Sequence, residues 1–175
     1  LIYNAQTNAL RLIEGWNYNF YHLTASTGKY GGDEILVMSN NIIDLETYDE
    51  KLDKTVKKSY YEDLNASFYN SIIFGYSKNE ILLSNDEKKE FNYLFDHCLV
   101  TAIKDSFDIN DTNIINEVIF NENPEFKDID SAFFDLDTLS PAKDKASIFR
   151  VNEALDKLQF DINGEDRTID DGPDI

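Results

Sequence analysis

The chain has 175 residues and is strongly acidic, with 34 Asp and Glu against 16 Lys and Arg and a formal net charge of -18. A surface this negative repels nucleic acid and anionic membranes, so we expect neither as a direct partner and expect a protein with a basic surface instead. An apolar content of 42%, with 12 Phe and 10 Tyr, is enough for a core and excludes disorder of the whole chain.

The compartment follows from what the sequence lacks. No run approaches the roughly 20 apolar residues that span a bilayer, and the start at Leu1 shows no basic region followed by an apolar stretch. The single cysteine, Cys98, has no partner for an internal disulfide. We therefore predict the cytoplasm, of a bacterium or of a phage-infected host cell, because the abundance of Asn, Ile and Lys is typical of AT-rich phage and low-GC bacterial genomes.

The first half of the chain has a spacing of apolar residues that predicts helices. Between Asn4 and Leu23, one helical stripe is formed by Leu10, Ile13, Trp16 and Phe20. From Leu45 to Phe68, apolar residues again recur every three or four positions, which predicts a long helix. Beyond it, residues 71–76 and 80–83 flank a short polar turn and predict either a hairpin or a helix end with its linker.

The second half is also predicted to be helical. Residues 85–107 follow a capping-box pattern that begins at Ser84, and their apolar positions fit one helix face. A second helix is predicted over 141–159, where Ser140 and Pro141 form a typical start. Asn163-Gly164 predicts a two-residue hairpin turn. No internal repeat is evident, so we predict one compact domain over 1–169 and a flexible acidic tail over 170–175.

These elements together predict a mainly α fold of four to six helices with at most one short β-hairpin, and an α+β fold is the alternative. No catalytic motif accompanies them. Cys98 falls on the apolar stripe of its helix, which favours a core residue over a nucleophile paired with His22. His97 and Cys98 are adjacent and point about 100 degrees apart on a helix, so they do not share a metal.

Three acidic clusters, at 108–113, 128–137 and 161–166, have the alternating oxygen side chains that suit hard cations. Each departs from the EF-hand pattern, because the closing Glu is replaced by Ile119 after the first cluster and by Gly172 after the third. Solvated loop or capping residues are the better interpretation. We therefore predict no cofactor and no metal site, and an enzyme that uses clustered carboxylates and a divalent metal is the least favoured class.

The acidic surface as a whole is the remaining candidate. An array of carboxylates can imitate the charge spacing of DNA and occupy the basic groove of a nucleic-acid-handling protein. The sequence thus favours an acidic protein-binding module, an inhibitor of the anti-restriction, anti-CRISPR or toxin-immunity kind. The alternative is a structural component of a phage or other macromolecular assembly, and the oligomeric state stays open. The expected interface residues are Glu117, Glu122, Glu125, Asp128, Asp130, Asp135, Asp137, Glu165 and Asp166.

Overall fold

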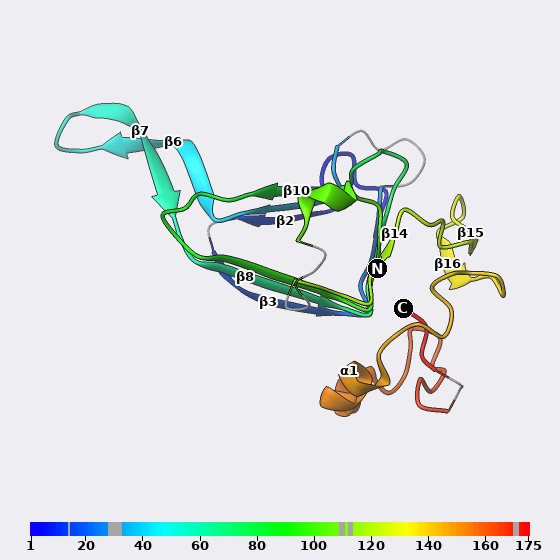
Figure 1. Ribbon diagram of the computed structural model, residues 1–175. Helices are drawn as coiled ribbons and strands as arrows, with labels where there is room; N and C mark the ends of the chain where they lie inside the picture. The colour runs from blue at the N-terminus through cyan, green and yellow to red at the C-terminus, as the bar shows by residue number, and fades with distance from the viewer. Residues whose placement is uncertain (14, 28–32, 109–110, 112–113, 170–171) are drawn as a thin grey trace.

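The computed structural model describes residues 1–13, 15–27, 33–108, 111, 114–169 and 172–175 (Figure 1). Most of its regular elements are β-strands, and the described part contains only two short α-helices. The predicted mainly α fold is therefore wrong. The strands are short, mostly parallel, and wound into successive turns of a solenoid.

Each turn of the solenoid contributes one strand to each of up to three parallel sheets. The first turn holds β1 (Ile2–Tyr3), β2 (Leu10–Ile13) and β3 (Trp16–Tyr21). The second turn holds β4 (Thr24–Ser26), β5 (Leu36–Ser39) and β8 (Leu64–Tyr69). The third turn holds β9 (Ile72–Phe74), β10 (Ile81–Ser84) and β11 (Phe91–Asp96).

The later turns are shorter. The fourth turn contributes β12 (Leu99–Val100), the 3-10 helix η1 (Lys104–Ser106) and β13 (Ile115–Asn116), and β14 (Ile119–Phe120) follows. The resulting sheets run β1-β4-β9-β12-β14, β2-β5-β10 and β3-β8-β11-β13, and we call them the first, second and third sheet. All pairings within them are parallel, so the body is a three-sided parallel β-helix.

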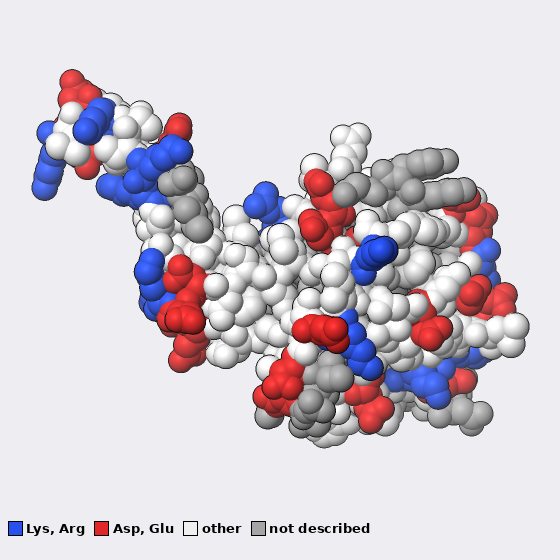
Figure 2. Space-filling view, turned by 45° about the horizontal axis from the view of Figure 1, so that its top comes forward, with Lys and Arg blue, Asp and Glu red and all other residues white. Residues whose placement is uncertain are grey.

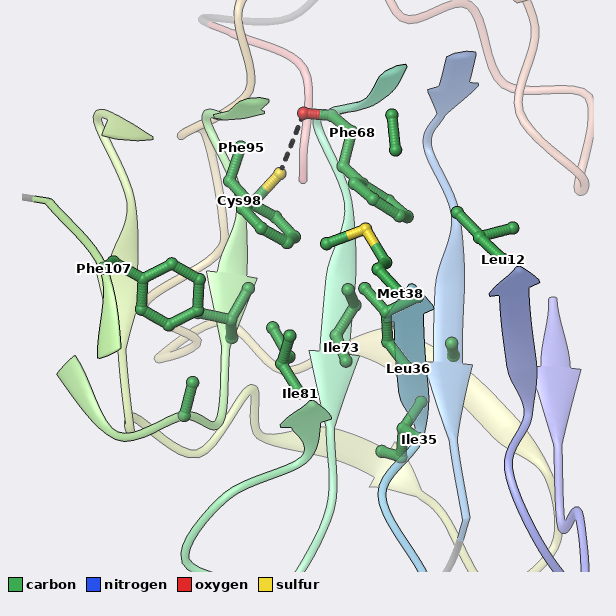
Figure 3. Close-up of a cluster of buried hydrophobic side chains, with 14 of the residues drawn as sticks. Leu12, Ile35, Leu36, Met38, Phe68, Ile73, Ile81, Phe95, Cys98 and Phe107 are labelled. Atoms are coloured by element: carbon green, nitrogen blue, oxygen red, sulfur yellow. Dashed lines mark hydrogen bonds between the residues drawn. The ribbon is translucent and has the colours of Figure 1, made fainter. Parts of the chain in front are cut away.

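The interior of the β-helix is filled by alternate residues of each strand, because successive side chains of a strand point to opposite faces. In β8, Leu64, Ala66 and Phe68 are buried. Phe68 stacks between Phe20 and Phe95 of the neighbouring turns, with ring centroids 4.9 and 5.0 Å apart. These separations match the spacing of paired strands, about 4.8 Å, so the aromatic stack follows the axis of the solenoid. Figure 3 shows two members of the stack, Phe68 and Phe95.

One corner of the β-helix repeats in every turn. His22, Asn70, His97 and Glu117 each follow a strand of the third sheet and have positive φ angles between 48 and 53°. The backbone N–H groups of the first three donate to the carbonyls of Tyr69, Asp96 and Asn116 in the next turn. Asn and His tolerate this left-handed conformation better than most residues, which suits them to the corner.

Two segments depart from the solenoid. The antiparallel hairpin formed by β6 (Asn41–Asp49) and β7 (Lys54–Tyr61) projects away from the body as an arm (Figures 1 and 2). The C-terminal segment contains the hairpin β15 (Phe126–Asp128) and β16 (Phe133–Leu136) and the helices α1 (Ile148–Glu153) and α2 (Leu155–Leu158), and it continues to Ile175.

The C-terminal segment covers the outer side of the first sheet. Ile72 and Leu99 point outward from that sheet and pack with Ala142 and Ile175 in a second small core. The backbone N–H of Ile175 donates to the Ala142 carbonyl at 3.1 Å, and Pro173 is also buried. Pro173 and Ile175 are thus packed, in a segment where the sequence predicts a flexible acidic tail. The proposed domain boundary at residue 169 stays a prediction.

The helix predictions fail for a common reason. Aromatic and aliphatic side chains occur both inside and outside the β-helix, so the strands do not show the simple alternation of apolar and polar residues that would identify them. The segment 4–23 forms β2 and β3, and 45–68 forms the arm and β8. The capping-box segment 85–107 contains β11, β12 and η1. The segment 141–159 contains α1 and α2, but α1 begins after Ser147.

The two predicted hairpins have different outcomes. The strands β9 and β10 exist at 71–83 but belong to different sheets, so they do not pair with each other. The Asn163-Gly164 turn joins Phe160 and Asp166 in an isolated antiparallel bridge, and Gly164 has φ +84°. Among the described residues, neither helix is long and apolar enough to cross a membrane.

Glu80 carries a buried carboxyl group directly before β10. It is 1% exposed, its Oε1 accepts from the Ser77 N–H at 2.8 Å, and its Oε2 has no hydrogen-bond partner. Burial raises the pKa of Glu80 and outweighs the hydrogen bonds that lower it. Folding therefore disfavours ionisation of Glu80, and the stability that its neutral form contributes is lost as pH rises through the raised pKa.

The Glu80→Gln variant is expected to be as stable as the parent protein at low pH and more stable at neutral pH, by about 1 kcal/mol. The amide keeps a neutral group of the same shape and removes the buried charge. Urea unfolding at pH 4 and pH 8 measures the difference. A stability gain that is equal at both pH values would show that the Glu80 charge is not the cause.

Candidate functional site

A cleft of about 540 Å³ separates the β-helix from parts of the C-terminal segment. Its floor includes Thr24 and Ile72 of the first sheet. Its walls come from the hairpin β15–β16, from the loop 161–167 and from residues 172–175. Segments distant in the sequence thus meet on one side of the molecule, to the right of the first sheet in Figure 1.

Carboxylates outnumber cations along this cleft. Its cationic side chains are Lys127, Lys143 and Arg167. Its acidic residues are Asp135, Asp144, Asp161, Glu165, Asp166 and Asp174. A concave site with this balance concentrates negative potential and attracts ammonium and guanidinium groups.

Several of these carboxylates also hold the cleft in shape. Asp135 accepts from the Asn163 amide at 3.2 Å and lies 3.5 Å from the Lys127 Nζ, which ties β16 to the loop 161–167. Asp161 Oδ1 accepts from the backbone N–H groups of Asn163 and Glu165, both at 2.8 Å. The arrangement leaves Glu165 exposed at the rim.

Asp166 occupies the same loop with its charge held in place. Its carboxylate accepts from the hydroxyl and N–H of Thr168 and from the amide of Gln159. These hydrogen bonds, those from Thr168 first, hold the pKa of Asp166 below its usual range. Asp166 therefore stays ionised to lower pH than an ordinary aspartate.

His22 lines the cleft but carries no charge at neutral pH. Burial first, and the nearby Arg167 guanidinium second, lower its pKa to about 4. Its Nε2 lies 3.2 Å from the amide nitrogen of Asn70, an arrangement in which Nε2 accepts. A neutral imidazole with this hydrogen bond links two corner residues of the solenoid, and it is poorly suited to general acid catalysis near pH 7.

The nine interface residues expected from the sequence divide into two groups. Asp135, Glu165 and Asp166 line the cleft. The other six lie outside it, along residues 117–137: Glu117, Glu122, Glu125, Asp128, Asp130 and Asp137. Of these, Asp128 and Asp137 cap local turns through the N–H groups of Ser131 and Leu139.

No family model, curated protein or solved structure matches this chain. Function is therefore argued from the geometry of the chain itself.

The acidic clusters do not assemble into a metal centre in the described part of the chain. No group of three or more His, Cys, Asp and Glu side chains lies close enough there to hold an ion. Four positions of the cluster at 108–113 lie outside the described residues, namely 109, 110, 112 and 113. In the other two clusters, Asp128 and Asp161 instead accept backbone N–H groups.

Cys98 is a core residue, as the sequence predicts. It is fully buried, its Sγ donates to the Phe68 carbonyl at 3.3 Å, and burial raises the pKa of the thiol to about 12 (Figure 3). A thiol with so little thiolate at neutral pH is a weak nucleophile. The hypothesis of a Cys98–His22 pair therefore receives no support from the geometry.

Sequence reasoning missed an ion-pair network beside the corner residues. Asp96 is 3% exposed, and its carboxylate binds Arg150 Nε at 2.7 Å, His97 Nδ1 at 2.6 Å and Asn116 Nδ2 at 2.8 Å. Burial alone would raise the pKa of Asp96, but these three partners lower it below the usual range. Arg150 is remote in sequence, so no local pattern indicates the pairing.

Proposed function

We propose that this chain is an acidic protein-binding module whose cleft receives a basic segment of a partner protein. One observation carries the proposal: carboxylates from β16, the loop 161–167 and the C-terminal residues gather around one concave site. Cationic side chains that enter such a site make charge-assisted hydrogen bonds, which are stronger than neutral ones.

The concave shape of the cleft argues against the DNA-mimic version of this function. An inhibitor that occupies the basic groove of a nucleic-acid-handling protein must present its carboxylates on a protruding surface. The cleft instead favours acceptance of a protruding basic peptide. In the view of Figure 2, acidic side chains form separate patches with Lys and Arg between them. We place this function in the cytoplasm, for the reasons given by the composition.

A basic peptide probe tests the proposal. Fluorescence anisotropy of a labelled oligolysine peptide is expected to show binding that weakens steeply as salt rises. The Glu165→Lys variant should bind about tenfold more weakly, which corresponds to about 1.4 kcal/mol. Glu165 is exposed and lies at the rim, so its replacement should leave the fold intact.

The matched control is Glu50→Lys, an exposed position on the arm that changes the net charge by the same amount. Equal weakening by both variants would show attraction to the overall charge and would contradict a specific cleft. Binding that is insensitive to salt would contradict it as well.

A structural component of an assembly is the second candidate, and an observation at the first turn favours it. Trp16, the first residue of β3, is 77% exposed. A large exposed aromatic side chain is typical of a surface that contacts another chain. A discrete oligomer in sedimentation that persists at high salt and is lost in Trp16→Ala would favour this function over the cleft.

A further inference from the structure

The outer face of the third sheet forms a second surface, separate from the cleft. Strand alternation fixes its residues: Tyr18 and Phe20 of β3 pack against the core, as do the inward residues of β8 and β11. The side chains between them point outward. These outward residues are Asn17, Asn19 and Tyr21 on β3, Asn65, Ser67 and Tyr69 on β8, and Asn92, Leu94 and Asp96 on β11.

The composition of this face is unusual for the chain. Asp and Glu account for 34 of the 175 residues, yet the outward positions of β3 and β8 contain none. The one carboxylate on β11, Asp96, is buried and paired with Arg150. The outward positions therefore present amides, a hydroxyl, two tyrosines and Leu94 without net charge, whereas the protein as a whole carries -18.

The polar groups are arranged in rows across the strands. The parallel register aligns Asn17 with Asn65 and Asn65 with Asn92, and the Asn92 amide donates to Asn65 Oδ1 at 2.9 Å. Asn17 and Asn19 are both exposed. An amide both donates and accepts hydrogen bonds, so such a row offers paired groups at the strand spacing of about 4.8 Å.

Aromatic rings form a row at the end of the face. Tyr21 and Tyr69 stack with centroids 4.7 Å apart. The Arg150 guanidinium of α1 lies over the Tyr69 ring at 4.4 Å, and the exposed Phe149 is its neighbour. In Figure 1, α1 lies beside the ends of β3 and β8, and the outer side of these strands is otherwise uncovered by described segments. The helix thus bounds the face on one side.

We infer that this face binds an uncharged, hydroxyl-rich polysaccharide. A sugar hydroxyl donates and accepts hydrogen bonds as an Asn amide does, and the C–H side of a sugar ring packs on an aromatic ring such as that of Tyr21. An anionic polymer would be repelled by the acidic protein, and the outward positions of β3 and β8 offer a basic protein no carboxylate. Glu90, which accepts from the Asn92 amide at 3.3 Å, lies directly before β11 at the border of the face. A neutral polymer matches both the lack of charge and the repeated rows.

Retention on polysaccharides tests the inference. The probes are insoluble cellulose, chitin and xylan in pull-down, and gels that contain soluble starch, laminarin or galactomannan in affinity electrophoresis. The full chain is expected to bind at least one of these polymers equally at low and high salt, because no ion pair is involved. Tyr21→Ala should weaken that binding about tenfold, and Asn19→Ala about fivefold.

The control is Tyr48→Ala, which removes a tyrosine of the arm that is 56% exposed and remote from the face. Circular dichroism confirms that each variant is folded. Retention on none of the six polymers overturns the inference. Retention that is unchanged in both Tyr21→Ala and Tyr48→Ala overturns the inference as well. Loss of polysaccharide binding in Tyr21→Ala with unchanged binding of oligolysine would separate this face from the cleft.

Discussion

Replacing Arg150 by alanine is expected to lower the free energy of unfolding by about 3 kcal/mol, because the change leaves the buried Asp96 carboxylate without its cationic partner. The Arg150 Nε lies 2.7 Å from Asp96 Oδ2, and the side chain also covers the Tyr69 ring. His97 and Asn116 remain as hydrogen-bond donors, so the loss should lie at the lower end of the range for broken buried pairs. Urea unfolding at pH 7 measures it.

The pH dependence of the same variant supplies a second readout. The folded-state pKa of Asp96 is lowered, so the stability that it contributes is complete above the ordinary aspartate pKa and is lost as pH falls through the lowered value. Without Arg150 the pKa of Asp96 should rise toward its ordinary range. The acid unfolding midpoint of Arg150→Ala should therefore shift to higher pH.

Glu153→Gln is the matched control, since it removes the other partner of Arg150 while Asp96 keeps its cation. The Arg150–Glu153 contact is 2.8 Å long and lies near the surface, so its loss should cost less than about 1 kcal/mol. A similar loss in Glu153→Gln and Arg150→Ala would contradict the assignment to the buried carboxylate. In Asp96→Asn, the further change Arg150→Ala should have a smaller effect.

The apolar or polar character of each segment could be read from the sequence. Whether its apolar residues follow the period of a helix or of a strand could not. The core character of Cys98 follows from its apolar neighbours in any secondary structure. The apolar positions of 85–107 fit a helix equally well on paper, whereas the structure places Phe91, Tyr93 and Phe95 on one side of a strand. The high content of Phe, Tyr and Ile along the whole chain is typical of β-strands.

The repeat was present in the sequence but irregular. A short motif forms the same corner in each turn. It is Tyr21-His22-Leu23-Thr24 in the first turn and Tyr69-Asn70-Ser71-Ile72 in the second. The arm at 41–61 lies between these two motifs, and the later turns differ in length. A search for a fixed period fails on such a chain, although corner residues of Asn and His type were a usable signal.

The acidic site was predictable only in part. The sequence predicts Asp135, Glu165 and Asp166 as interface residues together with six others, and the fold brings only these three to the cleft. Nothing local predicts that Thr24 and Ile72 of the β-helix form its floor. The asparagine row of the third sheet was equally hidden, because Asn17, Asn65 and Asn92 align only through the parallel register.

Phe68→Ala is expected to lower the free energy of unfolding by about 4 kcal/mol, the range seen for large core aromatics. Phe68 is fully buried and stacks on both Phe20 and Phe95, so the change leaves a cavity between three turns of the solenoid. A solenoid is held together by contacts between adjacent turns. Removal of the central ring should therefore weaken two interfaces at once, which urea unfolding followed by circular dichroism will measure.

Trp16→Ala is the control for the size of the removed ring. Its side chain is 77% exposed at the first turn, so its loss should change stability by less than about 0.5 kcal/mol. Comparable losses in the two variants would contradict the core position of Phe68. The denaturant slope adds a further test, because a solenoid split at the second turn should unfold less cooperatively, with a lower slope than the parent protein. An unchanged slope with a lower midpoint would mean that the turns unfold together even without the aromatic stack.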